Sequence, residues 1–284
     1  PEVPAVREGW RLGEPDLTLR LQEPFSLDAG TNEIVRYFVL PAQGHDHLTI
    51  RAVAFQPDAR AVVRGAAVFV DASGRARELD AADAGPGFSH ADDYPATPPV
   101  GVWMPGEDPV MHDGAGYRLP AGADIVLRIH YKKTWITEGM EFTDQSRLGV
   151  YFTDDDAAQI ESLVVTSLTE VSGREVTFRH TLEQESTVLA LFPEVDIESS
   201  ELQVEAVKPD GSRVPMLWLH EPDSGWPIRF WFDTPVTLPA GTDIEATVVL
   251  DPAAGRISRE SLLGDGTAPL RFSIDYVPGA LSSK

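Results

Sequence analysis

The chain has 284 residues, of which 42% are hydrophobic and none is cysteine. This length suits one large domain or two of ordinary size, and the apolar fraction is sufficient for a buried core. The lack of cysteine excludes disulfides, thiolate catalysis and zinc–cysteine sites. With 45 acidic against 23 basic residues the net charge is −22. Such a charge disfavours nucleic acid and anionic lipid as partners, and it favours either basic partners or simple solubility.

Membrane and targeting signals are not visible in the sequence. No stretch approaches the roughly 20 apolar residues that a bilayer-spanning helix needs. The chain starts at Pro1 without a recognisable signal peptide. We therefore expect a processed start or an excised domain, with an anchor upstream of Pro1 as an open alternative.

The apolar pattern has a period near two along most of the chain, which is typical of half-buried strands rather than helices. The 23 glycines and 23 prolines separate the apolar runs as turns. No long amphipathic helix is expected, although residues 82–85 and 259–264 could each form a helical turn. Strands are predicted, in chain order, at 17–21, 34–40, 48–55, 61–70, 125–131, 148–152, 163–166, 176–180, 188–192, 202–207, 228–232, 244–250 and 270–276.

An internal repeat suggests the domain count. The frame Leu-Pro-Ala-Gly-Ala-Asp-Ile at 119–125 returns, with one substitution, at 238–244. In each copy a Pro-Ala-Gly turn leads into an apolar strand, which indicates two similar modules. We therefore predict an all-β protein with domains at 1–155 and 156–284, the first carrying a long Gly/Pro-rich excursion at 80–118.

Several segments, taken in order, resemble the copper type II, ascorbate-dependent monooxygenase family, the class of peptidylglycine α-hydroxylating monooxygenase and dopamine β-monooxygenase. The resemblance runs from about Trp10 to Val277 and implies two tandem antiparallel β-sandwiches of jelly-roll type. It also implies that tryptophans such as Trp103 and Trp218 pack inside the fold. The matching segments are 10–16, 60–71, 101–106, 113–131, 146–152, 192–193 and 218–250.

The resemblance implies one copper ion in each domain, held by histidines and one methionine. In the first domain, a His-His pair should follow Val62-Val63, but this chain has Arg64 and Gly65 there. The later histidine of that site matches His130. An arginine places a permanent cation where a divalent metal should lie, because a guanidinium is not deprotonated in proteins.

The second copper position departs further from the family. A His-x-His motif should follow the Phe-Pro step at 192–193, and Glu194 and Asp196 stand there instead. The methionine should lie near Leu270, yet no methionine follows Met216. Hard carboxylate oxygens suit Cu(I) poorly. With one of six ligands kept, the resemblance implies a degenerate, non-catalytic member without a cofactor.

Two other clusters are weaker metal candidates. His45 and His47 form the only His-x-His of the chain, and on a strand they would share one face. Together with His130 they are the best candidates for relocated copper ligands. The acidic stretch around Glu194 and Asp196 lacks the spacing of a calcium loop, so a solvated acidic edge is the favoured interpretation.

A sandwich pair that loses its metals is expected to be kept for its surface. We therefore expect a non-catalytic structural subunit or interaction module on the periplasmic or extracellular side. Its expected partners are subunits of an exported or membrane-associated redox, respiratory or photosynthetic complex, by analogy with the family. Two alternatives stay open: a copper monooxygenase or copper-binding protein with relocated ligands, and a small-molecule binding module that uses the interdomain cleft.

Overall fold

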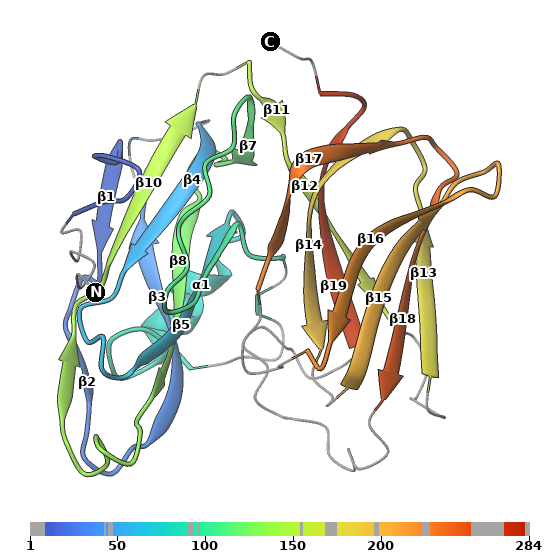
Figure 1. Ribbon diagram of the computed structural model, residues 1–284. Coiled ribbons are helices and arrows are strands. Elements are labelled where there is room, and N and C mark those ends of the chain that lie inside the picture. The colour runs from blue at the N-terminus through green and yellow to red at the C-terminus, as the bar shows by residue number, and fades with distance from the viewer. Residues whose placement is uncertain are drawn as a thin grey trace, which may run out of the picture. The chain divides into compact units, whose positions relative to one another are not determined.

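The computed structural model (Figure 1) describes residues 9–42, 44, 48–89, 94–95, 97–153, 156–167, 175–195, 199–222, 228–250 and 270–281. The chain divides into two compact units, Pro1–Ala157 and Ala158–Lys284. Within the described ranges, no helix has the length and apolar character to cross a membrane.

The first unit is built from antiparallel strands and one short helix. One sheet has the strand order β1-β10-β4-β7 and a second has the order β3-β8-β5-β6, while β2 and β9 form a separate pair. The elements are β1 (Leu17–Arg20), β2 (Phe25–Leu27), β3 (Glu33–Pro41), β4 (Thr49–Gln56), β5 (Val63–Asp71), α1 (Arg75–Ala82), β6 (Gly101–Trp103), β7 (Ala115–Arg118), β8 (Asp124–Lys132), β9 (Phe142–Asp144) and β10 (Arg147–Thr153).

The second unit contains two four-stranded antiparallel sheets. Their strand orders are β12-β19-β14-β17 and β13-β18-β15-β16. The elements are β11 (Ala158–Gln159), β12 (Glu161–Thr166), β13 (Glu175–Thr181), β14 (Ser186–Val195), β15 (Ser199–Val207), β16 (Arg213–His220), β17 (Phe230–Leu238), β18 (Asp243–Leu250) and β19 (Leu270–Pro278).

The two units share one strand order. Replacing β1, β3, β4, β5, β6, β7, β8 and β10 by β12 through β19, in sequence, converts the sheets of the first unit into those of the second. This eight-strand, two-sheet arrangement has the order of a jelly roll. The prediction of an all-β antiparallel sandwich fold is therefore confirmed.

The repeated frame lies at equivalent places in the two units. Gly122 and Gly241 have φ of 72° and 80°, a region that favours glycine, and each turn is closed by a backbone hydrogen bond to the proline carbonyl. The turns lead into β8 and β18, which are the second strands of their sheets. The similarity of the seven-residue frames therefore reflects the same turn and the same following strand.

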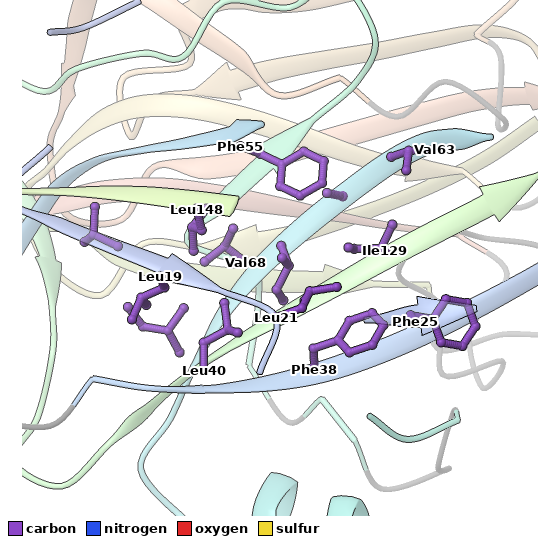
Figure 2. Packing of buried hydrophobic residues seen from close by; sticks show 14 of the residues in the cluster. Leu19, Leu21, Phe25, Phe38, Leu40, Phe55, Val63, Val68, Ile129 and Leu148 are labelled. Atoms are coloured by element: carbon purple, nitrogen blue, oxygen red, sulfur yellow. The ribbon is translucent and has the colours of Figure 1, made fainter. Parts of the chain in front are cut away.

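Alternation along the strands builds the core of the first unit. On β8, Ile125, Leu127, Ile129 and Tyr131 belong to the buried cluster, whereas the intervening Arg128 and His130 lie on the other face of the sheet. Figure 2 shows the apolar side chains of facing strands meeting in this core, among them Leu19, Phe38, Val68 and Leu148. A fully buried side chain of this kind stabilises the fold by about 1.5–3 kcal/mol.

The Gly/Pro-rich excursion contains more regular structure than predicted. It includes β6 and β7, both of which join sandwich sheets. The helical turn expected at 82–85 lies instead at α1, because the carboxylate of Asp71 accepts the backbone N–H groups of Ser73 and Ala76 and fixes the helix start earlier. The turn expected at 259–264 lies outside the described residues. Arg36, 7% exposed, anchors the excursion by donating to Asp83 and to the carbonyls of Pro86 and Gly87.

Candidate functional site

The position where the resemblance places the first histidine pair is a β-bulge. The register of β5 against β8 shifts between Val63 and Gly65, so Arg64 is the extra residue. Its Nη2 donates to the carbonyl oxygen of Ala61 at 3.0 Å. Gly65 lies directly opposite His130. Two positions that the resemblance assigns to one copper site therefore form one cross-strand pair.

The same bulge occurs in the second unit. The register of β15 shifts between Ser199 and Glu201, and Glu201 pairs with Val249 on β18. Val249 stands 119 residues after His130, which is the offset of the repeat. The bulge is thus a property of the duplicated strand order, and the residue on it differs between the units.

His130 is engaged by a carboxylate. Its Nε2 lies 2.6 Å from Oε1 of Glu33, and Oε2 of Glu33 lies 2.9 Å from Nζ of Lys132. Burial lowers the pKa of His130 below its usual value, and the hydrogen bond to Glu33 only partly opposes this. Burial acts to raise the pKa of Glu33, but hydrogen bonds from Lys132 and His130 outweigh it, so that pKa is lowered overall. At pH 7 a neutral imidazole therefore donates Nε2–H to an ionised Glu33, which leaves Nδ1 for any other ligand.

The lowered pKa of His130 predicts a pH effect on stability. The unfolded chain takes up this proton near pH 6.5, before the folded protein does, so the contribution is present above that pH and is lost as pH falls. We expect the free energy of unfolding to decrease more between pH 7.5 and 5.5 in the wild type than in His130→Gln. Urea unfolding at both pH values measures the difference, with His220→Gln, an exposed histidine, as the control. An equal decrease in the wild type and His130→Gln would contradict the prediction.

Two of the positions assigned to the second copper site, Glu194 and Leu270, lie on β14 and β19. Val195 pairs directly with Leu270, and Glu194 pairs with Arg271. Leu270 is fully buried and belongs to the apolar core of this unit. The Glu194 side chain, Asp196, His45 and His47 lie outside the described residues. Within the described part of the chain, no group of three or more His, Cys, Asp or Glu side chains could hold a metal ion.

The sequence patterns did not predict an exposed apolar turn between β8 and β9. The turn between β8 and β9 carries Trp135, Ile136 and Met140, which are 82%, 65% and 51% exposed. Three large apolar side chains within six residues form what we call the apolar tip. The available signal was a Trp-Ile step that follows a strand and precedes Gly139 without the alternation of a strand.

The apolar tip is ordered by its own hydrogen bonds. The backbone N–H of Thr134 donates to Oγ1 of Thr137 at 2.8 Å, and the N–H groups of Thr137 and Glu138 donate to the carbonyl of Thr134. At its base, Lys133 is 6% exposed and donates through Nζ to the carbonyls of Asp28 and Ala29. These hydrogen bonds hold the turn in one conformation while the three apolar side chains stay exposed to solvent.

The resemblance implied that Trp103 and Trp218 both pack inside the fold, but only Trp103 does. Trp103 lies against Phe55, with ring centroids 5.1 Å apart in an edge-to-face contact. Trp218 on β16, in contrast, is 74% exposed. The expectation was wrong for Trp218 because β16 is the edge strand of its sheet and Trp218 lies on its solvent face.

Comparison with known proteins does not identify a family. No family model matches the chain, and no curated protein matches it. Among solved structures, the chain resembles Paenibacillus xanthan lyase with 9% identity and a TM-score of 0.25, covering 91% of this chain and 25% of that one. Infectious bursal disease virus VP2 subviral particle (10% identity, TM-score 0.19) and the Gt strain of that virus (12%, TM-score 0.22) are matched over 98% and 94% of this chain and 80% and 78% of theirs. The chain thus spans about a quarter of the lyase, and at these TM-scores no likeness carries an argument about fold or function.

Proposed function

We propose that this chain is a non-catalytic interaction module that acts on the periplasmic or extracellular side. It docks onto a protein subunit of a membrane-bound or electron-transfer complex. The apolar tip carries this proposal, because it places Trp135, Ile136 and Met140 in solvent on an ordered turn.

The chemistry of the apolar tip suits a protein partner. Tryptophan dominates many interface hot spots, and methionine adapts to irregular apolar pockets. A turn that is already ordered loses little conformational entropy on binding. Glu138 and Glu141 flank the apolar side chains, and both are exposed. We therefore infer an apolar pocket on the partner with a basic rim, in agreement with the net charge of −22.

The surroundings of His130 support the non-catalytic part of the proposal. A copper site needs several converging soft or imidazole ligands. Here Nε2 of His130 is hydrogen-bonded to Glu33, and the neighbouring bulge presents Arg64, a permanent cation. Leu270, near which the resemblance places the methionine ligand, is a buried residue of the apolar core.

Binding of the purified chain to membranes from the source cells tests the proposed docking role. Purified chain with a photo-crosslinking residue in place of Glu138 is expected to form a specific adduct with one membrane-complex subunit. Trp135→Ala in that background should weaken the association at least tenfold, as loss of a buried aromatic anchor does. Val110→Ala, at a residue that is 43% exposed in the same unit, is the matched control and should leave the association unchanged.

Two outcomes would contradict the proposal. An adduct of equal yield in the wild type, Trp135→Ala and Val110→Ala would show that the apolar tip is not the contact. Stoichiometric copper uptake of sub-micromolar affinity, measured by calorimetry and electron paramagnetic resonance, would instead favour the copper-protein alternative with relocated ligands.

A further inference from the structure

Two arginines face each other across neighbouring strands of the first unit. Arg20 on β1 is directly paired with Arg147 on β10, and Arg147 is paired in turn with Gln56 on β4. Directly opposed like charges destabilise a sheet. Neither guanidinium forms an ion pair with a carboxylate of the described residues; Arg20 donates to Oε1 of Gln145, and Arg147 donates to Oε1 of Gln56 at 2.9 Å. This unneutralised pair stands out in a chain with about twice as many acidic as basic residues.

A third arginine completes a polar cavity at this place. The cavity has a volume of about 340 Å³ and is lined by Arg20, Gln56, Pro57, Asp58, Arg60, Gln145 and Arg147. Arg60 is exposed and has no side-chain partner among the described residues. The cavity therefore holds three guanidinium groups and one carboxylate, a local excess of two positive charges.

A buried polar network fixes the walls of this arginine cavity. Asp144 is 1% exposed, and its Oδ1 accepts the backbone N–H of Ala59 at 2.8 Å. The hydroxyl of Ser146, which donates to the same carboxylate oxygen, accepts the backbone N–H of Asp58 at 3.1 Å. From the core side, the hydroxyl of Tyr131 donates to Oδ2 of Asp144 at 2.8 Å. The turn that carries Arg60 is therefore tied to the core.

Fixed side chains also frame the opening. The Arg147 guanidinium lies 5.8 Å from the ring centroid of Trp10, in a cation–π contact that restrains it. Gln145 holds Arg20 through its amide oxygen and donates its backbone N–H to Oδ2 of Asp58 at 3.3 Å. Two of the arginines are thus oriented before any ligand arrives, and Arg60 is left free to close on one.

We propose that this arginine cavity binds a small molecule through an oxyanion group: a carboxylate, phosphate or sulfate. Planar guanidinium forks match such groups in bidentate geometry, and charge-assisted hydrogen bonds of this kind are among the strongest in proteins. An oxyanion would neutralise the opposed Arg20 and Arg147, with which no carboxylate of the described residues forms an ion pair. The carboxylate of Asp58 would accept a hydrogen bond from a hydroxyl group of the ligand.

The site is independent of the apolar tip, and its test is separate. Isothermal titration of the full chain with inorganic phosphate, sulfate and citrate at low ionic strength should give a saturable Kd of about 1 mM or lower for at least one of them. The three anions distinguish phosphate, sulfate and carboxylate as the preferred group. Arg60→Ala should weaken that binding at least tenfold, and Arg20→Gln should do so independently.

Arg118→Ala is the matched control, because Arg118 is an exposed arginine of the same unit outside the cavity, and its loss changes the net charge equally. It should change the Kd less than twofold. The thermal midpoint of Arg60→Ala should equal that of the wild type, since Arg60 is exposed. Absence of saturable binding by all three anions, or equal weakening by Arg118→Ala and Arg60→Ala, would overturn the proposal.

Discussion

Asp144→Ala is expected to lower the free energy of unfolding of the first unit by about 3–5 kcal/mol. The change leaves several buried hydrogen-bond donors without an acceptor, and each such donor costs about 1–3 kcal/mol of stability. The hydroxyls of Tyr131 and Ser146 and the backbone N–H of Ala59 all donate to this carboxylate. Burial and the charge of Asp144 raise the pKa of Tyr131, so its hydroxyl stays protonated and remains a donor. Urea unfolding followed by peptide-resolved hydrogen exchange assigns the loss to residues 1–157.

Two further variants separate the network from general effects of charge. Asp144→Asn keeps one oxygen acceptor and should lose less stability than Asp144→Ala. Asp113→Ala removes an exposed carboxylate of the same unit and should stay within about 0.5 kcal/mol of the wild type. If Asp144→Ala were as stable as Asp113→Ala, the buried network would not hold the turn at 57–60, and the ordered walls of the arginine cavity would lose their explanation.

The strands that were predictable are those whose alternation faces a core. β18 alternates cleanly, β8 is an apolar strand buried along nearly its whole length, and both begin with the repeated turn, so their place and their relation could be predicted from the sequence. β16 was not predicted, because Pro215 interrupts its apolar run. Proline is tolerated there because β16 is at the edge of its sheet and the register against β15 shifts next to that residue.

The candidate sites were less predictable than the fold, because they depend on register. Arg20 and Arg147 are far apart in the sequence and belong to no motif, and only the pairing of β1 with β10 brings them together. The apolar tip gave a local signal, but one exposed Trp-Ile step cannot be told from a buried one without knowing where the strand ends. Gly65 and His130 were related by the family resemblance, and the strand pairing places them opposite each other.

The second large effect is expected in the other unit, at a buried ion pair. Nε of Arg229 lies 3.1 Å from Oδ2 of Asp275, and both side chains are almost completely buried, with 4% and 0% exposure. The hydroxyl of Ser162 donates to the other oxygen of Asp275. The guanidinium of Arg229 lies over the rings of Phe192 and Trp231, at 5.3 and 5.6 Å from their centroids. These cation–π contacts only partly replace the solvation that the buried guanidinium loses, so Arg229 depends on the carboxylate of Asp275.

Asp275→Ala should therefore lower the free energy of unfolding of the second unit by about 3–5 kcal/mol, because it leaves Arg229 buried without its carboxylate. The double variant Arg229→Met/Asp275→Leu should recover most of that loss, since an apolar pair of similar volume needs no compensation for buried charge. Urea unfolding of the wild type, Arg229→Met, Asp275→Leu and the double variant completes the thermodynamic cycle, with hydrogen exchange assigning the change to residues 158–284. A double variant whose loss equals the sum of the single losses would show that the two side chains act independently, and the ion pair would then not account for their burial.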